Sequence, residues 1–130
     1  MPVGFSAFTT LERYYNDGDV VLFDGVSSNF GGYFNLETGI FVCPYWGVYW
    51  FSVTCRGGTS NSCNALITVD GSYKAQVHGW VSEKINQAAV SIVVECKVGQ
   101  SVWIQNNGDN RYYNGADKTN VFSGYLLHKY

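Results

Sequence analysis

The chain has 130 residues, enough for one domain with a substantial core, and residues 1–130 predict a single domain. The formal net charge is only −2, so there is no basic field to attract nucleic acid or anionic lipid, and binding to either is not expected. Hydrophobic residues make up 46% of the chain and charged residues 14%, with 15 Gly. This balance indicates many short strands joined by tight turns.

Extended segments separated by turn residues follow one another along the whole chain, and no stretch shows helical periodicity. The Asp70-Gly71 pair predicts a two-residue hairpin between two of these segments. Residues 11–19, 80–87 and 107–119 are polar or rich in glycine, and we expect them to be loops. The predicted strands are 4–10, 20–23, 40–43, 47–55, 62–69, 72–79, 88–98, 101–106 and 120–129.

The segment 47–53 is a run of aromatic and β-branched residues of the kind that strands favour. Side chains alternate along a strand, so Tyr49 and Phe51 point to one face while Trp50 and Ser52 point to the other. The first face is predicted to be core. Trp50 on the second face indicates a sheet whose outer surface contacts another molecule. The alternative is that Trp50 covers a loop, since a single exposed aromatic residue needs no special explanation.

A spaced series of aromatic, asparagine and glycine residues runs through the first half of the chain, at Phe23, Asn29, Phe34, Phe41, Gly47, Tyr49 and Phe51. This spacing resembles the signature of the globular head domain of complement component 1q, a relative of the tumour necrosis factor jelly roll. Val53 departs from it, where that family usually has Phe or Tyr. Residues 98–104 and 122–127 are similar to the closing strands of the family. The resemblance covers 4–130 and implies an all-β, ten-stranded antiparallel jelly-roll sandwich.

The resemblance also implies self-assembly. In that family, the sheet that contains the first strand, the last strand and the strand 47–55 packs against two copies of itself around a threefold axis. We therefore expect a homotrimer with a flat shared face. The residues that the resemblance places on this face are Trp50, Ser52, Ala89, Ser91, Phe122, Gly124 and Leu126.

Four cysteines allow three fully paired connectivities. Cys55 has the core-facing phase of its strand, and Cys63 follows a short loop at the start of the next strand, so a bridge between these two fits the predicted geometry. The alternative is that all four cysteines are reduced, buried, small hydrophobic residues. A zinc ribbon is excluded, because there is no CxxC pair and the two histidines lie far apart in the chain.

The sequence contains no pattern that indicates catalysis. There is no Gly-x-Ser-x-Gly turn, and neither His78 nor His128 has a motif partner that would make it a general base. The glycine-rich phosphate loops GxxxxGK and GxGxxG are missing as well. We therefore expect a protein that is not an enzyme.

Calcium is a candidate cofactor, because the loop 107–119 contains several hard oxygen donors. Asp109 and Asp117 are its candidate metal ligands. The alternative is that these residues are there as turn formers. Some members of the resembled family hold calcium near the trimer axis through aspartates before the strand that begins here at Ala88. No aspartate occurs in residues 82–87 of this chain, which argues against that version of the site.

The same loop has the residue types that sugar recognition requires. Asn110 provides an amide for paired hydroxyls, Arg111 a cation for an acidic sugar, and Tyr112 and Tyr113 provide rings that stack on the apolar face of a sugar. Trp80, in the neighbouring loop, offers a further platform. The alternative is that Tyr112 and Tyr113 pack at a subunit boundary.

Two functions follow as hypotheses. The first is a trimeric pattern-recognition lectin of innate immunity that binds glycans or other repetitive microbial surface patterns, with avidity from three sites. The second is a cytokine-like or structural trimer that engages a protein receptor. We expect a secreted, extracellular domain, although the first residues do not form a signal peptide. No apolar run is long enough to cross a membrane, and the 130 residues include no collagen-like stalk.

Overall fold

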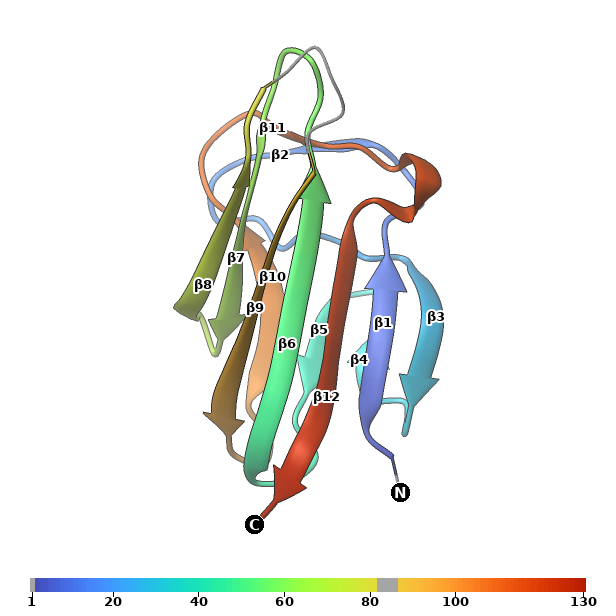
Figure 1. Cartoon of the computed structure of the whole chain (residues 1–130), viewed down its shortest axis with the longest axis vertical. Helices are drawn as coiled ribbons and strands as arrows, with labels where there is room; N and C mark the ends of the chain where they lie inside the picture. Colours follow the sequence, from blue (N-terminus) through green and yellow to red (C-terminus); the bar gives the residue numbers. More distant parts are fainter. Residues whose placement is uncertain (1, 82–86) are drawn as a thin grey trace.

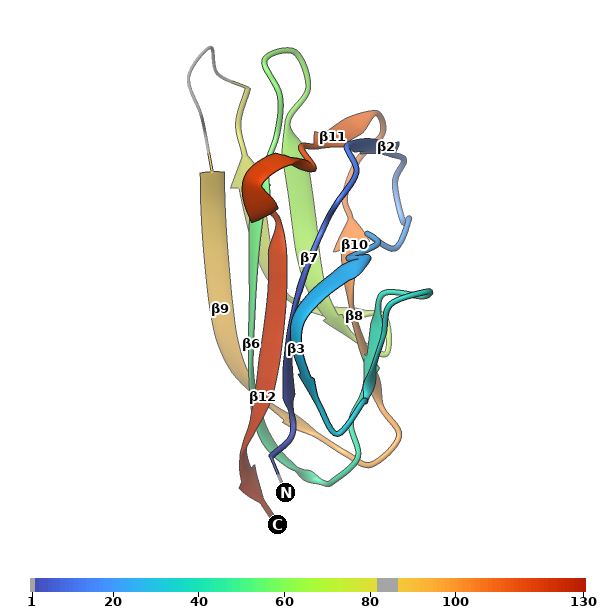
Figure 2. The same ribbon diagram turned by 90° about the vertical axis from the view of Figure 1, so that its right-hand side faces the viewer.

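The computed structural model describes residues 2–81 and 87–130, which form two facing five-stranded sheets and one small two-stranded sheet (Figures 1 and 2). The first sheet contains, in spatial order, β3 (Gly25–Phe30), β1 (Gly4–Phe8), β12 (Val121–Lys129), β6 (Gly47–Arg56) and β9 (Gln87–Cys96). The second contains β4 (Phe34–Asn35), β5 (Ile40–Val42), β10 (Ser101–Asn106), β7 (Cys63–Val69) and β8 (Ser72–Gly79). This architecture confirms the predicted antiparallel all-β sandwich.

The two-stranded sheet pairs β2 (Arg13–Tyr15) with β11 (Arg111–Tyr113), and it lies across one end of the sandwich (Figure 2). A 3-10 helix, η1 (Ala116–Lys118), follows β11. Both termini lie at the opposite end of the sandwich (Figure 1). We call the end with β2 and β11 the apical end and the other the basal end. Among the described residues, no helix is long and apolar enough to cross a membrane.

The core lies between the two sheets and consists mainly of aromatic rings. Along β6, buried and half-buried residues alternate without exception, as the sequence predicts for a strand with one core face. The ring of Phe5 stacks on Phe34 with centroids 4.7 Å apart and meets Phe122 edge to face at 4.8 Å. Phe41 also stacks on Phe5, at 5.0 Å. These offset and edge-to-face arrangements are the ones that aromatic pairs prefer.

The outward face of the first sheet has two rows of side chains that cross all five strands. The strand registers place residues of the same phase side by side on neighbouring strands. The first row, which we call the aromatic row, consists of Phe30, Gly4, Tyr125, Trp50 and Val93. The second, the serine row, consists of Ser28, Ser6, Ser123, Ser52 and Ser91. The hydroxyls of Ser6 and Ser123 are hydrogen-bonded at 2.8 Å.

The predicted phase of the last strand is wrong. Phe122 is fully buried and pairs with Val53, and Gly124 is buried opposite Phe51, so both face the core rather than the outside. Leu126 shares this phase and packs against the core. The outward positions of β12 are instead Val121, Ser123, Tyr125 and Leu127. Of the other residues expected on the shared face, Trp50, Ser52, Ala89 and Ser91 do point outward.

Two predicted loops and one predicted strand also differ from the structure. Residues 13–15 and 111–113, expected in loops, are strands because they pair with each other. The segment 20–23, expected to be a strand, makes only a single bridge, between Val20 and Gln105. The loop expected at 80–87 falls largely outside the described residues. The Asp70-Gly71 hairpin is confirmed, since β7 and β8 pair across it with φ angles of 49° and 83° at its two turn residues.

Asp24 joins the start of β3 to the chain that leaves β1, and we expect this contact to make stability depend on pH. Its carboxylate accepts hydrogen bonds from the Thr10 backbone N–H at 2.8 Å and from the Thr10 hydroxyl at 2.6 Å. Burial raises the pKa of Asp24, but these two bonds, together with a backbone hydrogen bond of Asp24 itself and the charge of Arg13, hold the pKa below its ordinary value of 3.8. A lowered pKa stabilises the fold above the ordinary value, and this contribution is lost as the pH falls through the folded value.

Urea unfolding of Asp24→Asn and of the unaltered chain tests this expectation. The unaltered chain should be the more stable at neutral pH, and its advantage should shrink as the pH falls from about 5 to about 3. A stability difference that stays constant over this pH range would contradict the assignment.

Candidate functional site

The apical end is closed by the pair β2 and β11, which places two tyrosines side by side on its outward surface. Tyr14 and Tyr112 are directly opposite each other in the register, with ring centroids 5.1 Å apart. The Tyr112 hydroxyl donates a hydrogen bond to Glu12 Oε2 at 2.5 Å, and this bond to a carboxylate raises the pKa of Tyr112 to about 12. Tyr14 is 62% exposed. An open groove of about 700 Å³ lies along β2, next to Tyr14.

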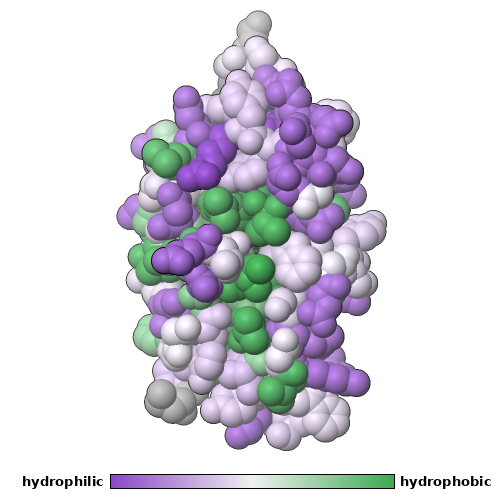
Figure 3. Space-filling view, turned by 180° about the vertical axis from the view of Figure 1, so that it is seen from behind, coloured by the Kyte–Doolittle hydropathy of each residue, from purple (hydrophilic) through white to green (hydrophobic). Residues whose placement is uncertain are grey.

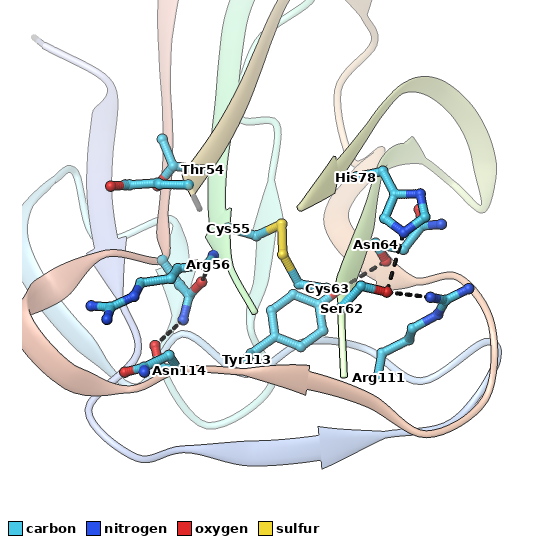
Figure 4. The surroundings of a disulfide bond; sticks show 12 residues. Thr54, Cys55, Arg56, Ser62, Cys63, Asn64, His78, Arg111, Tyr113 and Asn114 are labelled. Carbon is cyan, nitrogen blue, oxygen red and sulfur yellow. Dashed lines mark hydrogen bonds between the residues drawn. A yellow bond between two sulfur atoms is a disulfide. The ribbon is translucent and has the colours of Figure 1, made fainter. Parts of the chain in front are cut away.

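Arg111 is held at the start of β11 by two neutral oxygens, and Figure 4 shows its contact with one of them, the Ser62 hydroxyl. Its Nε donates to the Asn107 carbonyl at 3.1 Å, and its Nη1 donates to the Ser62 hydroxyl at 2.5 Å. His78 Nε2 lies 3.2 Å from the same hydroxyl. Both contacts of the guanidinium therefore fix its direction without neutralising its charge, which remains free to attract an anion.

The imidazole of His78 stacks on the indole of Trp80, with ring centroids 4.0 Å apart. Trp80 is 67% exposed, so the indole still offers surface to a ligand. Burial lowers the pKa of His78, and the nearby charge of Arg111 lowers it further. His78 is therefore neutral at pH 7, and Arg111 supplies the positive charge of the group formed by Arg111, Ser62, His78 and Trp80. We call this group the apical cluster.

The disulfide between Cys55 and Cys63 lies directly next to Ser62 of the apical cluster. It joins the end of β6 in the first sheet to the start of β7 in the second, across a sequence separation of 8 residues. It therefore closes the short loop that ends at Ser62, and it fixes the hydroxyl that Arg111 and His78 share (Figure 4).

Tyr113 does not belong to the ligand surface, contrary to the prediction. It is 1% exposed, and its hydroxyl lies 2.7 Å from the Asn64 carbonyl and 3.0 Å from Asn106 Oδ1. Burial raises its pKa strongly. The reason is the alternation along β11, which turns Tyr113 toward the core when Tyr112 faces outward.

The remaining predicted ligand residue, Asn110, is exposed and precedes Arg111 directly. It has a positive φ of 54°, and its backbone carbonyl accepts a hydrogen bond from the Asn61 side chain at 2.9 Å. Of the predicted ligand residues, Asn110, Arg111, Tyr112 and Trp80 thus lie at or near the apical surface. Ser62, His78, Tyr14 and Glu12 were not predicted. The repeated triplet Arg-Tyr-Tyr at 13–15 and 111–113 is a signal that could have indicated the pairing of β2 with β11.

The two residues predicted to bind calcium lie at opposite ends of β11. Asp109 precedes β11 and accepts a hydrogen bond from the Asp17 backbone N–H at 3.0 Å, while Asp117 lies in η1, beyond the other end of β11. Within 2–81 and 87–130, no three His, Cys, Asp or Glu residues are grouped so that they could hold a metal ion. Calcium binding stays a prediction.

Solved structures with the same architecture define the class of fold. The chain matches the globular domain of zebrafish complement 1qA protein with a TM-score of 0.80, at 20% identity, over 98% of this chain and 99% of that one. It matches murine APRIL with a TM-score of 0.76, at 10% identity, over 98% and 100%. Eiger TNF from S. frugiperda gives 0.76, at 9% identity, over 99% and 94%. The fold is thus the jelly roll that complement 1q and tumour necrosis factor domains share.

The C1q domain model matches residues 4–127, so the chain belongs to the C1q domain family. Among curated proteins, it is 27% identical to complement C1q and tumor necrosis factor-related protein 9 of Mus musculus, over 92% of this chain and 36% of that protein. It is 24% identical to the related protein 2 of Mus musculus, over 83% of this chain and 37% of that protein. The chain therefore spans less than two fifths of the length of these relatives.

Proposed function

We propose that this domain is a secreted, non-enzymatic homotrimer that binds glycans at its apical end, as a pattern-recognition lectin of innate immunity does. The observation that carries this proposal is the apical cluster, in which the guanidinium of Arg111 shares the Ser62 hydroxyl with His78, whose ring stacks on the exposed indole of Trp80. Membership of the C1q domain family supports a recognition module. Ligands of the proposed class are the acidic and neutral glycans of microbial or other repetitive surfaces.

The chemistry of the apical cluster suits an acidic sugar. The Arg111 guanidinium can form charge-assisted hydrogen bonds with a carboxylate. The exposed ring of Trp80 offers an apolar platform to a sugar, and the amide of Asn110 can donate to and accept from neighbouring hydroxyls. Tyr14 and Tyr112 supply a second platform on the same end of the domain.

The outward face of the first sheet supports self-assembly. Within the aromatic row, Trp50 and Tyr125 are in contact with ring centroids 5.4 Å apart, and Phe30 and Val93 are 55% and 57% exposed. Monomeric proteins seldom leave such a row of large apolar side chains in water. Three copies packed on this face would bury it and bring three apical clusters together, which increases avidity for a repetitive surface.

A glycan array tests the ligand, and Arg111→Gln tests the site. We expect binding to glycans that contain sialic or uronic acids, and the variant should lose about tenfold or more in affinity, because a hydrogen bond to a charged group contributes about 1.5–3 kcal/mol. Lys97→Gln, at the basal end, removes the same charge and should leave binding unchanged. Equal affinities for the unaltered chain and Arg111→Gln would place the ligand elsewhere.

The alternative is a cytokine-like or structural trimer that engages a protein receptor, and a second apolar surface favours it. Hydrophobic side chains form a band on the outward side of the second sheet (Figure 3). There, Val42 and Tyr73 are 42% and 60% exposed, and Leu66 lies opposite Gln105 of β10. If a receptor binds this band, we expect no saccharide binding on the array. We also expect Tyr73→Glu to abolish binding to the cell surface, and Arg111→Gln to leave it unchanged.

A further inference from the structure

Two cysteines outside the apical disulfide, Cys43 and Cys96, are both fully buried at the basal end of the sandwich. Cys43 follows β5 in the second sheet, and Cys96 is the last residue of β9 in the first sheet. The two thiols therefore come from opposite layers of the core.

Backbone hydrogen bonds join Cys43 to the segment that follows Cys96. The Cys43 N–H donates to the Gln100 carbonyl at 2.9 Å, and the Gly99 N–H donates to the Cys43 carbonyl at 2.9 Å. Both partners belong to the turn that directly follows Cys96. On β9, Cys96 continues the inward phase of Ile92 and Val94, so its thiol points into the core.

Each of the two thiols is close enough to the other to change its acidity. The hydrogen bond to Cys96 raises the pKa of Cys43, and burial raises it further. The same hydrogen bond lowers the pKa of the Cys96 thiol. The thiolate is the form of a cysteine that reacts with a disulfide.

We propose that Cys43 and Cys96 form a second disulfide, which joins the two sheets at the basal end as Cys55 and Cys63 join them at the apical end. A chain that keeps Cys55 and Cys63 bonded belongs to an oxidising environment, where a second pair of adjacent thiols is oxidised as well. The new bond would close a much longer loop than the eight-residue separation of Cys55 and Cys63. A longer loop restricts the unfolded chain more strongly.

The oxidant is a small-molecule disulfide of the oxidised-glutathione class, and the reaction is two exchanges. The thiolate of one cysteine attacks one sulfur of the small disulfide, forms a mixed disulfide and releases one small thiolate. The thiolate of the other cysteine then attacks the protein sulfur of this mixed disulfide, and a second small thiolate leaves. Two electrons pass from the protein to the oxidant, and the two protein protons go to the two released thiolates. Because both sulfurs are buried in the folded domain, the exchange takes place during folding.

Peptide mapping of the intact chain tests the bond directly. The chain is refolded in a buffer of reduced and oxidised glutathione, alkylated in denaturant with iodoacetamide, and digested without reduction by trypsin and chymotrypsin. Chymotrypsin cleaves after aromatic residues such as Tyr45 and Trp46, and so separates Cys43 from Cys55. We expect a Cys43 peptide linked to a Cys96 peptide, lighter by two hydrogens than the reduced pair. Alkylated Cys43 and Cys96, or either cysteine linked to Cys55 or Cys63, would overturn the proposal.

The variant Cys55→Ser/Cys63→Ser isolates the second bond. Adding a reductant to it should lower its melting temperature by about 5 °C or more, because only Cys43 and Cys96 remain to be reduced. Cys43→Ala/Cys96→Ala is the matched control, in which the effect of a reductant reports Cys55 and Cys63 alone. A melting temperature of the first variant that does not respond to the reductant contradicts the proposal. The outcome does not depend on whether the domain binds glycans.

Discussion

Replacing Trp50 by glutamate is expected to reduce the native mass of the protein from three chains to one. Trp50 lies on β6, the fourth of the five strands in the first sheet, and packs between Tyr125 and Val93 in the aromatic row. Packing this face against two copies would place three carboxylates in an apolar contact. A buried charge without a partner costs several kcal/mol, which is comparable to the free energy of a subunit contact. Light scattering measures the mass directly.

Tyr73→Glu is the matched control, because it also replaces an exposed aromatic residue by glutamate, but on β8 of the opposite sheet. This variant should remain a trimer. A monomeric unaltered chain would show that the aromatic row has another partner, and it would make that row the first surface to screen for ligands. A trimer that survives Trp50→Glu but not Tyr73→Glu would move the interface to the second sheet.

Gly124→Val is expected to destabilise the fold by about 1–3 kcal/mol or more, as overpacking of a tight core does. A Cβ at this position would lie within 2.6 Å of two atoms of the Phe51 ring, and 2.9 Å from the ring of Phe5. Neither ring is free to move away, since Phe5 is stacked on Phe34 and Phe41, and Phe51 packs on Phe41 and Phe122. The lack of a side chain at Gly124 is thus what lets β12 approach the aromatic core.

Urea unfolding at one fixed protein concentration measures the effect, which should appear as a midpoint lower by about 1 M or more. Gly124→Ala should be affected less than Gly124→Val. Ser72→Val adds bulk at the exposed start of β8, and its effect should be within about 0.5 kcal/mol. Equal midpoints for Gly124→Val and Ser72→Val would show that the core accommodates a side chain at Gly124.

The parts of the fold that local pattern determines could be predicted from the sequence. In the second half of β6, the apolar residues Phe51, Val53 and Cys55 alternate with the polar residues Ser52, Thr54 and Arg56, so the phase of the strand can be read. The hairpin between β7 and β8 depends on Asp70 and Gly71, two residue types that tolerate positive φ. Both features need no knowledge of any other segment.

The last strand shows where such reading fails. In β12, Phe122, Gly124 and Leu126 alternate with Ser123, Tyr125 and Leu127, and both sets contain large apolar residues. A strand with apolar residues on both faces has no contrast from which its phase can be read. Only the pairing of Gly124 with Phe51, and the close approach that it permits, decides which face is the core.

The candidate site shows the same limit. Arg111 and Trp80 could be identified because their residue types suit sugars, but Ser62 and His78 gain their role from contacts between β7, β8 and β11. Tyr112 and Tyr113 have identical side chains, and only the pairing of β11 with β2 decides which of them is exposed. Long-range pairing of short strands is what local pattern does not contain.

The serine row places a hydroxyl on each of the five strands of the first sheet, at one height across its outward face. A subunit that packs there must offer polar partners at that height, or leave hydroxyls buried without water, at about 1–3 kcal/mol for each unsatisfied group. A related jelly-roll chain with valine or leucine at these positions would meet that cost. If the first sheet packs against copies of itself, as proposed above, the row would favour identical chains over related chains that have apolar residues at these positions.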